Sequence, residues 1–209
     1  MSIKAIPPGI RVIHIISNIA FWFFTAGFVL VSSVFIFYLF DSGEETNDFD
    51  FILPAHVNMA ERGIFEIDEQ EIQIQIVNAQ AYIRFNNAPN KMIIFIILYS
   101  YPMIGTVVFI LFVFKRFLTN VKKGLIFDIR NIKLLKIISY GLLAYWVLSL
   151  ISYQIGYFYV EDIIKIPGVE LTNSFDISLP VLFVAAFIWV LSHVFIAGIK
   201  LQEENELTI

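Results

Sequence analysis

Four long apolar stretches dominate the pattern of the chain. Each runs for about 20 residues or more without Asp, Glu, Lys or Arg, and each has charged residues beyond at least one of its ends. A helix of about 20 apolar residues crosses the roughly 30 Å hydrocarbon core of a bilayer. The pattern predicts an all-α membrane protein, a four-transmembrane-helix bundle whose helices lie within residues 12–40, 92–114, 137–159 and 179–199.

The first two stretches are separated by a segment that reads as β structure. Within residues 41–91, residues 71–77 alternate between polar and apolar side chains, and an apolar run at 81–85 follows closely. Alternation of this kind is typical of strands, and two runs this close together predict a hairpin. Two strands are marginal alone, so we expect a small β-rich extracytoplasmic insertion completed by weaker strands at 49–53 and 64–67, or by residues 160–178.

Helix-ending residues refine these bounds. The Pro7-Pro8-Gly9 run predicts that the first helix starts close to Arg11. Pro102 and Gly105 predict a kink in the second helix without ending it. Residues 122–124, Lys-Lys-Gly, predict its end, and Asp128 is a candidate N-cap for the third helix.

The distribution of charge predicts the orientation. Lys and Arg in short loops stay on the cytoplasmic side of a membrane. Ten of the 14 basic residues lie in the N-terminal tail, in residues 115–136 or just after the fourth stretch, whereas 14 of the 18 acidic residues lie in the other two connections. We therefore expect three parts: an N-terminal tail with helix 1 (1–40), an extracytoplasmic domain (41–91), and helices 2–4 (92–209) with a basic cytoplasmic loop (115–136) and an acidic tail (201–209).

Composition agrees with a membrane protein. Hydrophobic residues make up 58% and charged residues 15% of the chain, and the mean hydropathy is +0.78, values that exclude an ordinary soluble domain. No small-residue cleavage site precedes Asp41, so we expect the first stretch to remain as a helix and not to be removed as a signal peptide. The chain has no Cys, which excludes disulfides and thiolate chemistry.

Candidate chemistry is sparse. No nucleophile motif, zinc motif or phosphate-binding glycine loop is present, so we predict no enzyme activity, no cofactor and no metal site. His14 and His193 fall at similar depths near the cytoplasmic ends of their helices and could form a pH-sensitive pair. The absence of charged residues from the four stretches argues against a pump. It does not argue against a channel formed by several copies of the chain. Uncharged polar side chains in the stretches are expected to bond between helices: Thr25, Ser32, Ser33, Ser100, Ser139, Ser149, Ser152 and Gln154.

The basic loop has two interpretations. Its lysines and arginines could attract anionic lipid headgroups, each contributing about 1 kcal/mol near a membrane surface. Alternatively, the acidic residues of the C-terminal tail, Glu203, Glu204 and Glu206, could dock on the loop or compete there with a partner protein. Exposed ion pairs contribute about 0 to 1 kcal/mol, so such docking would be reversible.

The residues of the basic loop and of the C-terminus resemble a known family. The loop reads FLTNVKKGLIFD from Phe117 to Asp128 and continues with Asn131, and the chain ends in QEENELTI. Together these strings resemble bacterial domain-of-unknown-function family 2975, over helices 2 to 4. The resemblance implies four spans in the bacterial cytoplasmic (inner) membrane and a regulatory pair with a small Xre-like helix-turn-helix protein, whose gene often lies beside that of the family member.

These observations lead to one hypothesis and two alternatives. The chain is predicted to be a membrane-embedded regulator or sensor that binds a small cytoplasmic helix-turn-helix transcription regulator, with no direct contact to nucleic acid. The alternatives are an oligomeric channel or transport subunit, in which the chain forms a homo-oligomer, and an accessory subunit of another membrane protein. The predicted partner-binding residues are Lys122, Lys123, Gly124, Asp128, Asn131, Glu203, Glu204 and Glu206.

Overall fold

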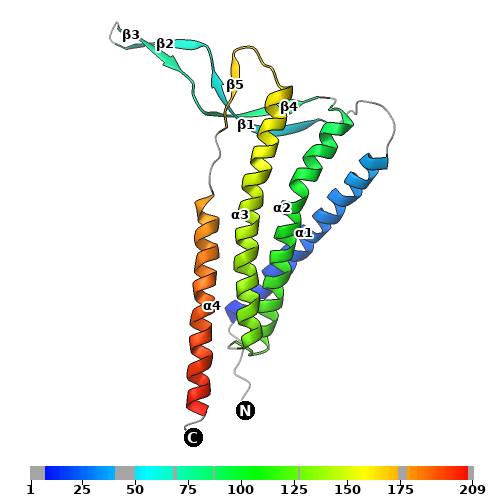
Figure 1. Ribbon diagram of the computed structural model, residues 1–209, viewed down its shortest axis with the longest axis vertical. Helices are drawn as coiled ribbons and strands as arrows, with labels where there is room; N and C mark the ends of the chain where they lie inside the picture. Colours follow the sequence, from blue (N-terminus) through cyan, green and yellow to red (C-terminus); the bar gives the residue numbers. More distant parts are fainter. Residues whose placement is uncertain are drawn as a thin grey trace. The chain divides into compact units, whose positions relative to one another are not determined.

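Four long helices make up most of the protein. The structure is a computed structural model of the chain, and it describes residues 8–40, 50–67, 70–86, 88–126, 128–173 and 178–206. All four helices are long and apolar enough to cross a membrane, which confirms the four predicted apolar helices. They are α1 (Pro8–Phe40), α2 (Asn90–Lys122), α3 (Ile129–Ile163) and α4 (Leu179–Glu206) (Figure 1).

Each helix extends beyond the apolar stretch that predicted it. α1 begins at Pro8, three residues before the expected start, because a proline at the first helical position lacks only a donor that would be unpaired there anyway. α2 runs through Pro102 without ending, as predicted. α4 continues to Glu206, so much of the predicted acidic tail is helical.

The described residues also contain five strands. β1 (Phe51–Met59), β2 (Arg62–Ile67), β3 (Gln70–Gln75) and β4 (Ala79–Phe85) lie between α1 and α2, and β5 (Val169–Leu171) lies between α3 and α4. They form a three-stranded sheet in the order β4-β1-β5 and a separate β2-β3 pair. Residues 51–53 of the first weaker candidate and residues 169–171 pair in the sheet that contains β4, as predicted, whereas the candidate at 64–67 lies in the separate β2-β3 pair. The expected strand start at Phe49 lies outside the described residues.

The predicted hairpin between β3 and β4 is wrong. β3 pairs with β2, from which two residues separate it, and β4 pairs with β1 in an antiparallel register that places Pro54 opposite Tyr82. Between β3 and β4 the chain stays bonded to the end of β1. Met59 N donates to Ile76 O at 3.0 Å, and Asn78 N donates to Asn58 Oδ1 at 2.7 Å. Asn78 has a positive φ of 51°, which an asparagine tolerates better than most residues.

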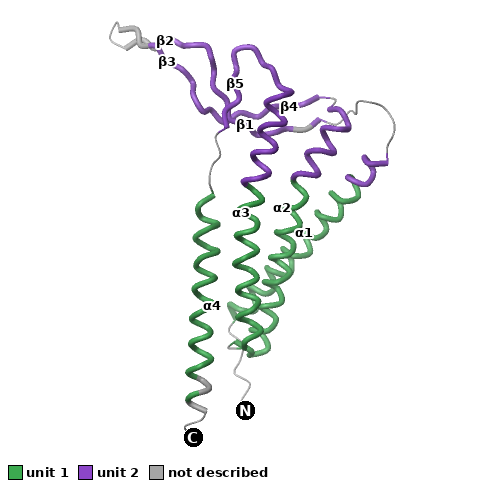
Figure 2. Tube along the Cα trace, viewed as in Figure 1, with its two compact units in different colours: residues 1–34, 100–149, 177–209 green, residues 35–99, 150–176 purple. Residues whose placement is uncertain are grey.

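The chain divides into two compact units (Figure 2). Unit 1 comprises residues 1–34, 100–149 and 177–209, and unit 2 comprises residues 35–99 and 150–176. The unit that contains the strands is therefore larger than the predicted segment 41–91, since it includes ends of α1, α2 and α3. Each unit has its own packing.

In unit 1, small and hydroxyl-bearing side chains join the helices. The Phe28 and Tyr101 rings of α1 and α2 lie 4.6 Å apart, and Ser32 Oγ lies 3.0 Å from Tyr101 Oη. Between α3 and α4, the buried Ser139 Oγ donates to Ala185 O at 2.8 Å. The bonds of Ser32 and Ser139 are helix-to-helix contacts of the predicted kind. The prediction is wrong for Thr25, Ser33 and Ser149, which donate to carbonyls of their own helices. Such contacts are the usual means of association for helices in lipid.

Gly141 marks a close approach of α3 to α2 in unit 1. A Cβ added at Gly141 would lie 2.9 Å from Ile110 Cγ1, whereas a Cβ added at Gly27 in α1 would meet no atom within 4 Å. The Ile110 side chain must therefore move to admit any other residue at position 141.

We expect Gly141→Leu to lower the free energy of unfolding by about 1–3 kcal/mol, because it overpacks this contact. Thermal unfolding of the purified protein in detergent measures the change. Gly27→Leu is the matched control, since it adds the same side chain where there is room. Equal unfolding midpoints for the two variants would show that Gly141 is not a packing constraint.

Candidate functional site

The end of α2 is built around a glycine in the left-handed conformation. Gly124 has φ +81°, Gly124 N donates to Val121 O at 3.0 Å, and Leu125 N donates to Asn120 O at 3.1 Å. These two bonds form the Schellman motif, in which the residue after the helix adopts positive φ. The predicted helix end at residues 122–124 is confirmed. The backbone angle, rather than lack of room, accounts for glycine, because a Cβ here would meet nothing within 4 Å.

The start of α3 is capped by Asp128. Its Oδ1 accepts a hydrogen bond from Arg130 N at 2.7 Å and lies 3.6 Å from Arg130 Nε. Asn131 N donates to Asp128 O at 2.9 Å. A carboxylate that accepts a backbone N–H in the first turn satisfies one of the unpaired helix donors, so the predicted N-cap is confirmed.

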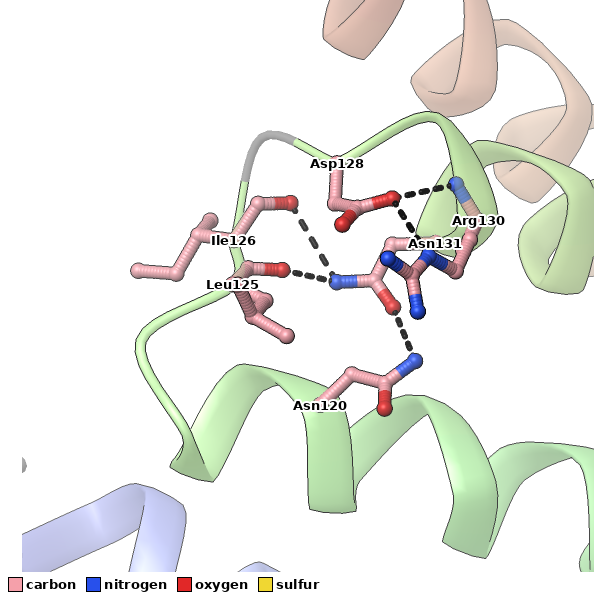
Figure 3. A network of polar contacts seen from close by, with 6 residues as sticks. All are labelled: Asn120, Leu125, Ile126, Asp128, Arg130 and Asn131. Carbon is pink, nitrogen blue, oxygen red and sulfur yellow. Dashed lines mark hydrogen bonds and ion pairs between the residues drawn. The ribbon is translucent and has the colours of Figure 1, made fainter.

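Asn131 fastens the connection between α2 and α3 (Figure 3). Its side chain is fully buried, with an exposed fraction of 0%. Nδ2 donates to Leu125 O and, at 3.4 Å, to Ile126 O, while Oδ1 accepts from Asn120 Nδ2 at 2.9 Å. One amide thus ties the turn to the end of α2. Asn131 was expected to contact a partner directly, but its burial restricts it to holding the turn in shape.

The outward side of this turn combines apolar and basic side chains. Leu125, Ile126 and Ile129 are 42%, 39% and 64% exposed. Around them stand four exposed basic residues, and within the described part of the chain only one of these, Arg130, forms an ion pair. We call this set the turn surface; it consists of Lys122, Lys123, Leu125, Ile126, Ile129, Arg130 and Lys133.

One further residue of the predicted basic loop, Lys115, packs between helices in unit 1. Lys115 Nζ lies 4.7 Å from the centre of the Phe21 ring and 5.2 Å from that of the Trp22 ring. A cation over an aromatic face is a favourable contact between α2 and α1. Lys115 therefore contributes to helix packing.

The other predicted site residues belong to α1 and α4. Glu204 is exposed on α4, and the side chains of Glu203 and Glu206 lie outside the described residues. His14 Nε2 lies 3.3 Å from Thr119 Oγ1, and the His193 ring lies 4.4 Å from the Trp189 ring. Among the described residues no hydrogen bond joins His14 to His193. The same residues contain no group of three or more His, Asp and Glu side chains that could hold a metal ion.

The sequence was compared with known families, curated proteins and solved structures. The profile of the family described as "Protein of unknown function (DUF2975)" matches residues 72–209, about two thirds of the chain. The chain belongs to this family. No curated protein and no solved structure matches it.

The match to the DUF2975 family covers β4, α2, the turn, α3, β5 and α4. Four residues of the loop motif that suggested the family build the turn: Asn120, Gly124, Asp128 and Asn131. Phe127 lies outside the described residues. Sequence reasoning missed Asn120 as the partner of Asn131, although two asparagines at facing ends of apolar helices are a signal of such a bond. It also missed the exposed apolar residues of the turn surface.

Replacing the central amide should loosen the turn. We expect Asn131→Leu to lower the free energy of unfolding by about 1–3 kcal/mol, because it leaves Leu125 O and Asn120 Nδ2 without their partner. Trypsin should then cut faster after Lys122 and Lys123. Tyr140→Leu, at a position that is 56% exposed on the same helix, is the control and should leave the cleavage rate unchanged.

A double-mutant cycle with Asn120→Leu isolates the contact between the two amides. The double variant should be less destabilised than the sum of the single variants, with a coupling of about 0.5–3 kcal/mol. Additive effects would contradict a direct role for the Asn120–Asn131 bond.

Proposed function

We propose that the protein is a regulator of the bacterial cytoplasmic membrane that binds a small cytoplasmic helix-turn-helix transcription regulator through the turn surface and the end of α4. In this proposal four helices cross the membrane, both termini and the turn lie in the cytoplasm, and the strands lie outside. The excess of Lys and Arg at residues 115–136 supports this orientation.

The observation that carries the proposal is the chemistry of the turn surface. Three exposed apolar side chains, Leu125, Ile126 and Ile129, stand among exposed Lys and Arg residues on a turn that is fixed by buried hydrogen bonds. Apolar side chains grouped in this way favour contact with another surface. A turn that is already rigid loses little conformational entropy on binding.

This chemistry defines the partner. The partner surface should offer an apolar depression for Leu125, Ile126 or Ile129, with acidic side chains around it for the basic residues. Charge complementarity of this kind speeds association and excludes wrongly charged partners. The choice of a small helix-turn-helix protein as the partner rests on what the family resemblance implies.

The acidic residues at the end of α4 give the contact a means of regulation. The end of α4 carries the negative charge of Glu203, Glu204 and Glu206. A partner of the turn surface is expected to carry negative charge as well. Exposed ion pairs contribute about 0 to 1 kcal/mol each, so the glutamates compete reversibly with the partner or share in holding it. This weak competition is suited to release of the partner on a signal.

Charge reversal at the turn tests the proposal. We expect Lys122→Glu combined with Lys123→Glu to abolish retention of the helix-turn-helix protein in a pull-down from native membranes. The two introduced glutamates lie beside the apolar side chains of the turn surface, where they would repel the acidic side chains of the partner. The matched control is Arg62→Glu with Lys165→Glu, which reverses two exposed basic residues outside the turn surface and gives the same net charge.

Bound proteins are identified by mass spectrometry, and thermal unfolding confirms that both variants fold. Retention of a helix-turn-helix protein by the wild type and the control, and its loss from the turn variant, would support the proposal. Identical protein sets in all three samples would contradict it and favour anionic lipid headgroups as the ligand of the turn surface.

A further inference from the structure

Unit 2 contains a cavity of about 310 Å³. Its wall is formed by β1, β4, the end of β5 with Thr172, and the parts of α2 and α3 that belong to the same unit. Small-molecule sites in proteins span about 300–1,000 Å³ and are mostly apolar with a few polar groups. The cavity therefore has room for one small molecule, and the chemistry of its wall indicates which kind.

Aromatic side chains dominate the helical part of the wall. Phe95 and Tyr159 stack there with ring centres 3.8 Å apart and planes at 18°, and Tyr99, Tyr153 and Tyr157 also line the cavity. None of the described residues that line it is Asp, Glu, Lys or Arg. A charged ligand would lose its hydration without a counter-charge, which is costly. The wall thus selects an uncharged, largely apolar molecule.

Two polar groups of the wall lack partners. His56 Nδ1 and Thr172 Oγ1 are both buried, and neither has a hydrogen-bond partner among the described residues. The two residues are neighbours, since Thr172 N donates to His56 O at 2.8 Å. An unmet buried polar atom costs about 1–3 kcal/mol, so such atoms call for an explanation. A ligand with a hydroxyl or carbonyl group supplies one.

We propose that this cavity binds an uncharged, largely apolar small molecule that carries one hydroxyl or carbonyl group. The apolar body of the ligand lies against the Phe95, Tyr159 and Tyr99 rings. Its polar group bonds to Thr172 Oγ1 or to the His56 ring, each of which turns about its own side-chain bonds to reach it. Such a ligand comes either from the bilayer or from solution. This site is separate from the turn surface and does not depend on the function proposed above.

A substitution at Gly156 can fill the cavity experimentally. Gly156 lines the wall, and a Cβ added there would lie 3.9 Å from Tyr99 Cζ, an ordinary contact. Gly156→Leu therefore admits its first carbon without strain and fills part of the cavity with the rest. The matched control is Gly27→Leu, where an added Cβ meets nothing within 4 Å.

Photo-crosslinking in phospholipid nanodiscs tests the site on the full chain. The probe is 4-(3-trifluoromethyldiazirin-3-yl)phenol, and its analogue is 3-phenyl-3-trifluoromethyldiazirine, which has neither a hydroxyl nor a carbonyl group. The competitor is 2-naphthol, and labelled peptides are mapped by mass spectrometry. We expect saturable labelling of peptides that contain residues 95–99 or 152–160, suppressed by 2-naphthol. Gly156→Leu should reduce it at least about tenfold, and Gly27→Leu should leave it unchanged.

Thr172→Val tests the polar group while keeping the shape of the side chain. It should weaken labelling by the diazirine phenol about fivefold, as expected for the loss of one hydrogen bond, and should leave labelling by the analogue without the hydroxyl unchanged. Its folding should be unaffected, because Thr172 Oγ1 has no partner to lose within the described part of the chain.

Two outcomes would overturn the proposal. One is labelling that does not saturate and spreads over all apolar helix faces, and the other is wild-type labelling in Gly156→Leu. Competition by farnesol added to the nanodiscs, an uncharged and largely apolar alcohol that dissolves in the bilayer, would identify the bilayer as the source of the ligand. Competition by phenol alone would identify the solution, and either result supports the cavity as the site.

Discussion

The structure depends on polar side chains that bond to a neighbouring helix within an apolar chain. Helices in lipid gain little from burying apolar surface against one another, so close packing and hydrogen bonds between them carry the association. Ser139 donates to Ala185 O in unit 1, and Ser152 Oγ donates to Tyr99 O at 3.2 Å in unit 2. Where such a bond forms, a small hydroxyl fixes the depth at which two helices meet.

Asn131 applies the same constraint at the end of the helices. Its buried amide binds Asn120 and the carbonyl of Leu125, so the connection between α2 and α3 is held from within. The apolar and basic side chains of the turn surface are consequently presented on a fixed backbone. Asn120, Asp128 and Asn131 shape the turn, and Leu125, Ile126 and Ile129 remain exposed on it.

Much of the fold could be predicted, because length, apolar composition and helix-ending residues act locally. Gly124 ends α2 and Asp128 caps α3, and both roles follow from the residues next to them in the sequence. The pairing of β4 with β1 could not be predicted, since it depends on hydrogen bonds near Met59 and Asn78 that join residues distant in sequence. The burial of Asn131 and the cavity beside His56 and Thr172 likewise arise from packing between separate elements, which no single stretch of sequence records.

The orientation of the chain in the membrane is the most direct test of the account. Because the natural chain contains no cysteine, Tyr82→Cys in β4 and Lys123→Cys in the turn surface can each be labelled alone with a membrane-impermeant maleimide. Both positions are exposed. The account predicts labelling of Y82C in intact spheroplasts, and labelling of K123C only after the membrane is permeabilised. Labelling of K123C in intact spheroplasts would contradict it, because the turn surface would then face away from any cytoplasmic partner.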